Sequence, residues 1–190
     1  MQKDAAGMVR QGWLGATLLV SGSYLAAFLL TFGVMMTLEE RISPAWANFT
    51  SLIFLPHGVR VLAAWLYGWR SLLYLAPGVA VGHLYLYGPV MDLHLAAAWI
   101  VGLGCAPLAF SLLAWLRLDY RLSRRRRTHW RDLVLVGAVA SVFNSGFSGL
   151  AYGNDLRTIS ARFVGDIMGT LVCVLLLMAV FRLRDRWRWG

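Results

Sequence analysis

The chain has 190 residues, of which 59% are hydrophobic and 14% are charged, and its formal net charge at pH 7 is +9. Soluble globular domains carry about 25% charged residues, so this composition excludes an ordinary soluble protein. It also leaves no room for a second, soluble domain beside the apolar segments. We therefore predict one transmembrane domain over residues 1–190, an all-α polytopic membrane helical bundle.

Six hydrophobic segments follow one another, each near the roughly 20 residues that a helix needs to cross a bilayer. They cover residues 13–36, 49–69, 72–87, 93–116, 133–152 and 159–181. The first segment follows Lys3 and Arg10 but has no small-residue cleavage site, which favours an uncleaved transmembrane helix over a signal peptide. The third segment is short and contains Pro77 and Gly78. The alternative to about six transmembrane helices is therefore five spans and one re-entrant hairpin.

The basic residues predict the orientation of these segments. If the N-terminus is cytoplasmic, only Arg41 and Arg157 fall in outer loops, while Arg60 and Arg162 lie within segments and all other Lys and Arg residues lie inside. Cytoplasmic loops are enriched in Lys and Arg. We expect a multi-pass protein of a bacterial cell inner membrane with both termini in the cytoplasm. The same placement accounts for the positive charge without a nucleic-acid partner.

The densest run of positive charge lies between the fourth and fifth segments, at Arg124, Arg125, Arg126 and Arg127. Anchoring of the topology is the simpler interpretation of this run. The alternative is a contact surface for anionic membrane lipids or for a protein partner, either in the membrane or at the cytoplasmic face.

A polar break interrupts the second segment at residues 54–60, where His57 and Arg60 share one helical face. Arg162 and Asp166 likewise share a face of the sixth segment, and Asn144 lies in the fifth. Ionisable side chains at bilayer depth are rare, face the interior of the bundle, and by default indicate a functional site. We expect these five residues to converge in the outer half of the bundle.

Two interpretations of this convergence stay open. In the structural one, Asp166 pairs with Arg60 or Arg162 and ties helices together, because an unpaired charge in lipid is very unfavourable. In the functional one, His57, Arg60 and Arg162 line a site for a small polar or anionic ligand, and Asp166 orients an arginine. Pro56 adds weight to the second, since it frees backbone groups that can face a cavity.

Catalytic and metal sites are not expected. The sequence has no paired carboxylates, Ser-His-Asp arrangement or nucleophile elbow, so we predict a non-enzymatic protein without a cofactor. Cys105 and Cys173 have no Cys or His nearby at metal-ligand spacing, and we expect both to be buried in packing. His57 and His83 have no carboxylate or thiol at familiar ligand spacing, so satisfied buried histidines are the better interpretation than a metal site.

Two patches of sequence resemble the first type of the MASE family of bacterial integral-membrane sensory domains. The first patch has Phe54, Pro56 and Gly58, then Gly68-Trp69-Arg70, then Pro77-Gly78; the second is Gly165-Asp166-Ile167-Met168-Gly169. The resemblance implies a multi-helix sensor that detects a signal from within or across the membrane. In that family the membrane part usually precedes a histidine kinase or a cyclic-dinucleotide enzyme. We expect no such output domain here, so a separate protein would have to read the state of this one.

Two other functions fit the same pattern. Six helices, this length and an outward-facing pocket are similar to the substrate-binding subunits of energy-coupling-factor vitamin transporters, by size and topology alone. The third possibility is an accessory subunit of a larger membrane complex, docked through the basic face and the Gly165/Gly169 pair. The expected function is thus a stand-alone sensory or ligand-binding module, with an uptake component or an accessory subunit as the alternatives.

Overall fold

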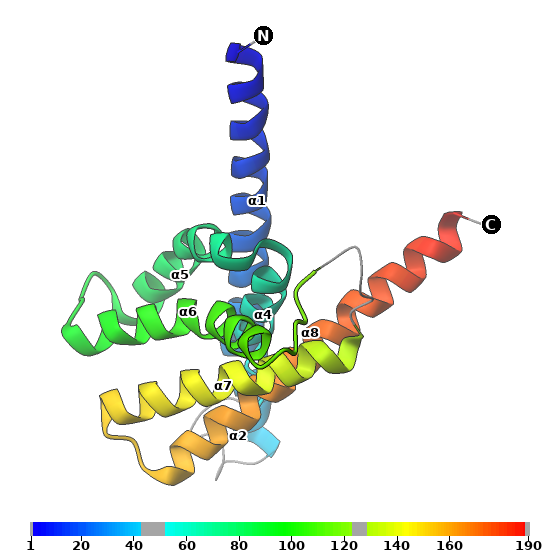
Figure 1. Ribbon diagram of the computed structural model, residues 1–190. Helices are drawn as coiled ribbons and strands as arrows, with labels where there is room; N and C mark the ends of the chain where they lie inside the picture. The colour runs from blue at the N-terminus through cyan, green and yellow to red at the C-terminus, as the bar shows by residue number, and fades with distance from the viewer. Residues whose placement is uncertain (1, 43–51, 123–128, 189–190) are drawn as a thin grey trace.

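A computed structural model of the chain describes residues 2–42, 52–122 and 129–188. The described residues are almost entirely helical and contain no strand (Figure 1). In chain order the elements are α1 (Gln2–Leu30), a π-helical turn (Thr31–Met35), α2 (Met36–Ile42), α4 (Leu55–Tyr67), a 3-10 turn (Gly68–Arg70), α5 (Ser71–Tyr87), α6 (Leu93–Trp115), α7 (Trp130–Tyr152) and α8 (Leu156–Arg188). The predicted all-α class is confirmed. The expected contact residues Arg124, Arg125, Arg126 and Arg127 lie outside the described residues.

Helix α4 occupies the middle of the molecule and packs against α1, α5, α6, α7 and α8 (Figure 1). One apolar core fills the space between α4, α6, α7 and α8, with Val61, Cys105 and Val136 fully buried. A second core joins α4 to α1 and α5 around Leu75, which is also fully buried. Because α4 is covered on both faces, its polar side chains are held inside the protein.

The start of α4 is fixed by its neighbours on both sides. Pro56 sits in the first turn, where a missing N–H has no cost. The backbone N–H of Leu55 donates to the hydroxyl of Thr31 in the π-helical turn (3.2 Å), and that of Phe54 donates to the carbonyl of Gly165 on α8 (2.9 Å). The start of α4 is therefore positioned by hydrogen bonds to a side chain of the π-helical turn and to the backbone of α8.

Glycines bring α4 and α8 into unusually close contact. A Cβ added at Gly58 would lie 2.6 Å from the carbonyl oxygen of Gly169, and a Cβ added at Gly169 would overlap the carbonyl of Phe54. Both Gly165 and Gly169 are buried in this contact. The Gly165/Gly169 pair is thus used to pack α8 against α4 within the chain, which leaves it no role as the docking surface of an accessory subunit.

Helix α5 continues through Pro77 with help from α1. Proline lacks an N–H and disturbs the helical ladder around it. The hydroxyl of Ser21 donates to the carbonyl of Tyr74 (2.7 Å) and accepts from the N–H of Gly78 (3.0 Å). Gly78 allows this approach, since a Cβ there would lie 2.9 Å from the carbonyl oxygen of Ser21. A side chain of α1 therefore closes the gap in the α5 backbone.

Three helical stretches of the described chain are long and apolar enough to cross a membrane: Gly12–Leu38, Leu93–Trp115 and Leu156–Leu183. Large apolar side chains such as Leu18, Ile100 and Leu176 are exposed on their outer faces, as lipid contact requires. The expected count of about six spans is not supported. Helices α4 and α5 have 13 and 17 residues, fewer than the roughly 20 that a crossing needs.

Candidate functional site

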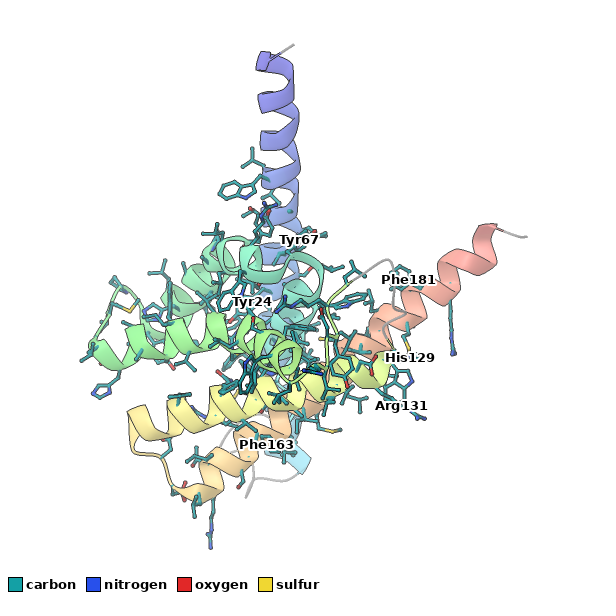
Figure 2. The ribbon with its side chains drawn as sticks, viewed as in Figure 1. Tyr24, Tyr67, His129, Arg131, Phe163 and Phe181 are labelled. Atoms are coloured by element: carbon teal, nitrogen blue, oxygen red, sulfur yellow. The ribbon has the colours of Figure 1, made fainter. Side chains whose placement is uncertain are left out.

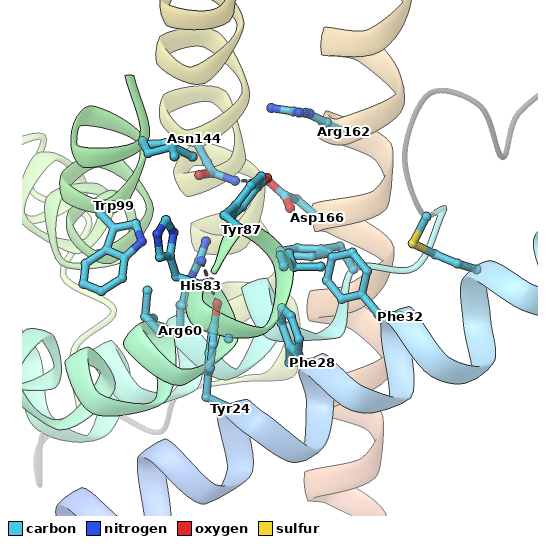
Figure 3. A pocket seen from close by; sticks show the side chains of 17 residues that line it. Tyr24, Phe28, Phe32, Arg60, His83, Tyr87, Trp99, Asn144, Arg162 and Asp166 are labelled. Atoms are coloured by element: carbon cyan, nitrogen blue, oxygen red, sulfur yellow. Dashed lines mark hydrogen bonds between the residues drawn. The ribbon is translucent and has the colours of Figure 1, made fainter. Parts of the chain in front are cut away.

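A cavity of about 420 Å³, which we call the central cavity, lies where α1, α4, α5, α6, α7 and α8 meet (Figure 3). Six aromatic side chains line it. Tyr24 and Phe28 belong to α1, Phe32 to the π-helical turn, Tyr87 to α5 and Trp99 to α6, while Phe54 directly precedes α4. Its polar lining consists of Arg60, His83, Asn144, Arg162 and Asp166. An aromatic enclosure with a few convergent polar groups is the usual form of a small-molecule site.

The guanidinium of Arg60 reaches into the central cavity from α4, and the residue is only 9% exposed. One Nη donates to the hydroxyl of Tyr24 (3.0 Å), and the guanidinium carbon lies 5.5 Å from the centre of that ring. Among the described residues, Nε has no hydrogen-bond partner. Gly102 on α6 leaves room for the group, because a Cβ there would lie 3.2 Å from the other Nη. Arg60 is therefore held in place with donor capacity to spare.

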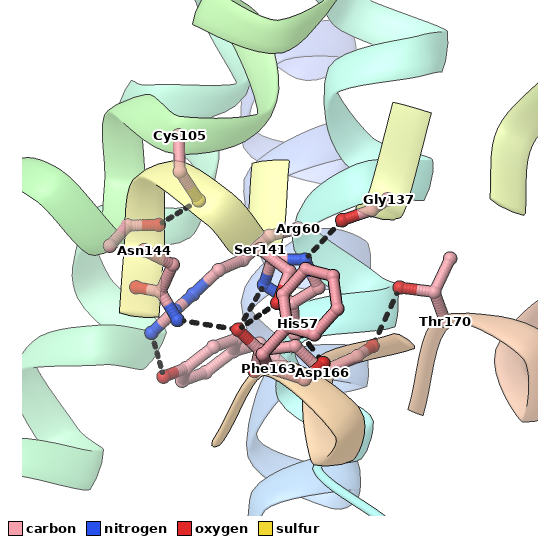
Figure 4. Close-up of polar contacts among 11 residues, drawn as sticks. His57, Arg60, Cys105, Gly137, Ser141, Asn144, Phe163, Asp166 and Thr170 are labelled. Carbon is pink, nitrogen blue, oxygen red and sulfur yellow. Dashed lines mark hydrogen bonds and ion pairs between the residues drawn. The ribbon is translucent and has the colours of Figure 1, made fainter. Parts of the chain in front are cut away.

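The carboxylate of Asp166 projects from α8 and is almost fully buried, at 2% exposure. Its Oδ2 accepts from the amide of Asn144 (2.8 Å) and from the hydroxyl of Ser141 (3.2 Å), both on α7. Figure 4 shows these contacts together with the bond from Thr170 to the Asp166 backbone carbonyl (2.9 Å). The carboxylate thus joins α7 to α8 through neutral donors.

The imidazole of His57 is fully buried between α7 and Asp166. Its Nε2 lies 3.2 Å from the carbonyl of Gly137, and since a carbonyl only accepts, Nε2 carries a proton. Its Nδ1 lies 3.5 Å from Oδ2 of Asp166, an ion-pair distance without hydrogen-bond geometry. His57 on α4 therefore lies between the α7 backbone and the carboxylate of Asp166 on α8.

Two of the described charged groups in the lining are the guanidinium of Arg60 and the carboxylate of Asp166. Within the described chain, Asp166 forms its ion pair with His57. In Figure 3, Arg162 extends from α8 beyond Asp166, toward Asn144. Charge in a low-dielectric interior is unfavourable unless it is compensated. The guanidinium of Arg60, which forms no ion pair with a described carboxylate, therefore favours an anion.

Four of the five predicted site residues, Arg60, Asn144, Arg162 and Asp166, line the central cavity. The fifth, His57, lies behind Asp166 and contacts it. The basic partner of Asp166 in these contacts is the histidine, whereas the sequence suggested an arginine; the described hydrogen bond of Arg60 goes to Tyr24.

The aromatic contribution of α1 was missed. Tyr24 and Phe28 follow one another at the spacing of one helical turn, and Phe32 continues the same stripe. Figure 2 shows Tyr24 in the centre of the molecule, while Phe181 near the end of α8 lies at its edge. An i, i+4, i+8 aromatic stripe was the available signal, although such stripes also pack ordinary cores.

Comparison of the chain with protein-family models, with curated proteins and with solved structures finds no match.

Proposed function

We propose that this chain is a non-enzymatic membrane protein that binds a small molecule in the central cavity and acts as a sensory module, as the resemblance to MASE domains implies. The observation that carries the proposal is the Arg60 guanidinium, 9% exposed, with an unpartnered Nε among the described residues, in a cavity of about 420 Å³. A purely structural arginine would be expected to fill its donors with protein acceptors, since unpaired buried donors are costly.

The arrangement of helices gives a bound molecule a route to the rest of the protein. The central cavity is lined from α1, α4, α5, α6, α7 and α8, so a ligand would contact all of them at once. Asp166 touches the cavity on one side and His57 on the other. Occupancy of the cavity would therefore bias the packing of α4 against α7 and α8, which is the differential interaction a sensor needs.

The location of the protein belongs to the same proposal. We infer a multi-pass protein of a bacterial inner membrane with both termini in the cytoplasm. The three apolar stretches support membrane insertion, and the distribution of Lys and Arg along the sequence supports the orientation. Membrane lipids and a protein partner in the membrane or at the cytoplasmic face are the expected partners.

The test is to purify the protein from its native membrane in mild detergent and to identify copurifying small molecules by mass spectrometry. Ala98 on α6 lines the central cavity, so Ala98→Phe should fill it and abolish copurification. The matched control is Ile100→Phe on the same helix, because Ile100 is 73% exposed. A molecule present in the wild type and in Ile100→Phe but lost in Ala98→Phe supports the proposal. The same molecules in all three, or none in any, would contradict it.

A further inference from the structure

We infer that the central cavity takes a small organic anion with an aromatic body, whose carboxylate is bound by Arg60. This inference rests on the proposed function and names the ligand class of the same site. It draws on three observations: the unused donor of Arg60, the absence of an ion pair between Arg60 and a described carboxylate, and the aromatic groups on either side of the guanidinium.

The first observation is the hydrogen-bonding state of Arg60. A guanidinium presents five N–H donors in a rigid fork that matches a carboxylate. The described hydrogen bond of this group goes to a neutral acceptor, the Tyr24 hydroxyl, and Nε has no partner among the described residues. The hydrogen bond to Tyr24 orients the fork, and Gly102 leaves room for it beside α6. A group held in one orientation with a free donor is suited to a planar anion.

The second observation is that the charge of the Asp166 carboxylate is compensated by its neighbours. An anionic ligand would be repelled by Asp166, which also faces the cavity. Oδ2 of Asp166, however, is contacted by the donors of Ser141 and Asn144 and by the ring of His57. These contacts compensate its charge locally, whereas Arg60 forms no ion pair with a described carboxylate. The charge that is left for a ligand anion is therefore that of Arg60.

The third observation is the distribution of rings. Figure 3 places Trp99 and His83 on one side of the cavity and Phe28 and Phe32 on the other, with Arg60 and Tyr24 between them. The ring centres of Phe28 and Phe32 are 4.5 Å apart, and those of His83 and Trp99 are 5.4 Å apart. Aromatic rings favour offset or edge-to-face contact with another ring. A flat aromatic body between the two groups would make such contacts, whereas inorganic phosphate would leave the rings without a partner.

The experiment measures binding of three probes by titration calorimetry, with empty micelles as the blank. The probes are 2-naphthoate, its neutral analogue 2-naphthamide, and octanoate, an aliphatic carboxylate that represents a fatty acid. Wild-type protein should bind 2-naphthoate about 10- to 100-fold more tightly than 2-naphthamide, the range that a charge-assisted hydrogen bond gives. It should also bind 2-naphthoate more tightly than octanoate. Equal affinity for 2-naphthoate and 2-naphthamide would contradict the inference that the ligand is an anion. Equal affinity for the two carboxylates would contradict the inference that it has an aromatic body.

Three variants assign the effect to Arg60. Arg60→Gln should lose the preference for 2-naphthoate over 2-naphthamide. Gly102→Ala keeps the charge but crowds the guanidinium, and it should weaken 2-naphthoate selectively; it serves in place of Arg60→Gln if that variant does not fold. Arg70→Gln, at an exposed arginine outside the cavity, should match the wild type. An unchanged preference in both Arg60→Gln and Gly102→Ala would contradict the inference.

The two proposals fail in different ways. If Ala98→Phe abolishes copurification of a small molecule but 2-naphthoate shows no advantage over 2-naphthamide, the cavity is a binding site for another class of ligand. If none of the probes binds and no molecule copurifies, the proposed function itself is wrong.

Discussion

Nδ1 of His57 on α4 lies 3.5 Å from Oδ2 of Asp166 on α8, and both side chains are shielded from solvent. This contact connects α4, at the centre of the molecule, to α8, the last of the described helices. It also connects the central cavity, which Asp166 lines, to a histidine that the cavity does not reach. The following predictions test this contact and the other links that hold α4 in place.

Asp166→Asn should destabilise the protein strongly. The buried carboxylate accepts from Ser141 and Asn144, and an amide in its place would leave buried polar groups unsatisfied, at a cost of about 1–3 kcal/mol for each. Unfolding by SDS titration in mixed micelles measures the change. The control is Asp119→Asn, because the pair of Asp119 with Arg121 is exposed and should contribute less than about 1 kcal/mol. Equal stability of Asp166→Asn and wild type would remove the structural role of the pair.

Gly169→Ala should separate α4 from α8. Its methyl group would overlap the backbone carbonyl of Phe54, and because a backbone atom cannot swing aside, we expect a loss of about 1–3 kcal/mol or more in the free energy of unfolding. Gly146→Ala on α7 is the control, since no described atom lies within 4 Å of a Cβ there. That change should be neutral or stabilising by up to about 1 kcal/mol. Identical effects of the two substitutions would show that the close contact is not maintained.

Ser21→Ala should weaken the contact between α1 and α5. Without the hydroxyl, the carbonyl of Tyr74 and the N–H of Gly78 each lose a described hydrogen bond, and an unsatisfied buried group costs about 1–3 kcal/mol. Thr17→Ala, one turn earlier on α1, removes a hydroxyl whose bond to the Trp13 carbonyl is exposed. Thermal unfolding should distinguish the two. A midpoint for Ser21→Ala as high as that for Thr17→Ala would argue against the bridge.

The first turn of α8 should loosen at acidic pH. The side chain and backbone N–H of Thr158 donate to Asp155 and hold the pKa of its carboxyl below the ordinary value of 3.8. A carboxyl with a lowered pKa in the folded protein stabilises it above the ordinary pKa, and the stabilisation is lost as the pH falls through the lower, folded value. Hydrogen exchange at the Thr158 amide, expressed as a protection factor, should therefore fall below about pH 4.

Asp155→Asn is the matched variant for this effect. Asparagine also caps helices but does not titrate, so the protection of Thr158 should become independent of pH across the same window. A decline of equal size in Asp155→Asn would assign the pH dependence to another group.

The sequence predicted the convergence of polar residues better than it predicted the membrane crossings. As expected, the central cavity brings together Arg60, Asn144, Arg162 and Asp166. Charged side chains on apolar helices avoid lipid by facing the interior of the bundle. The second predicted span was too long. Pro56 in the first turn and Gly68 at φ +58 limit α4 to 13 residues. The prediction used hydrophobicity, which does not indicate where a helix begins or ends.

The partners of the site residues could not be predicted in the same way. The i, i+4 spacing of Arg162 and Asp166 and the charge of Arg60 both suggested an arginine beside the carboxylate. The contact with His57 depends on how closely α4 approaches α8, which Gly58 and Gly169 determine. The use of Tyr24 as the acceptor for Arg60 likewise depends on the packing of α1 across α4. Such pairings depend on how the helices pack in three dimensions, so the spacing of residues along the chain does not predict them.

The central claim is that the cavity between Arg60 and Trp99 holds a small molecule. An experimental structure of the protein, purified from its native membrane without added ligand, tests this most directly. We expect non-protein density between the guanidinium of Arg60 and the rings of Phe28 and Trp99, with a planar group within hydrogen-bond distance of the guanidinium. A well-ordered cavity that contains only water, or one closed by these side chains, would contradict the account.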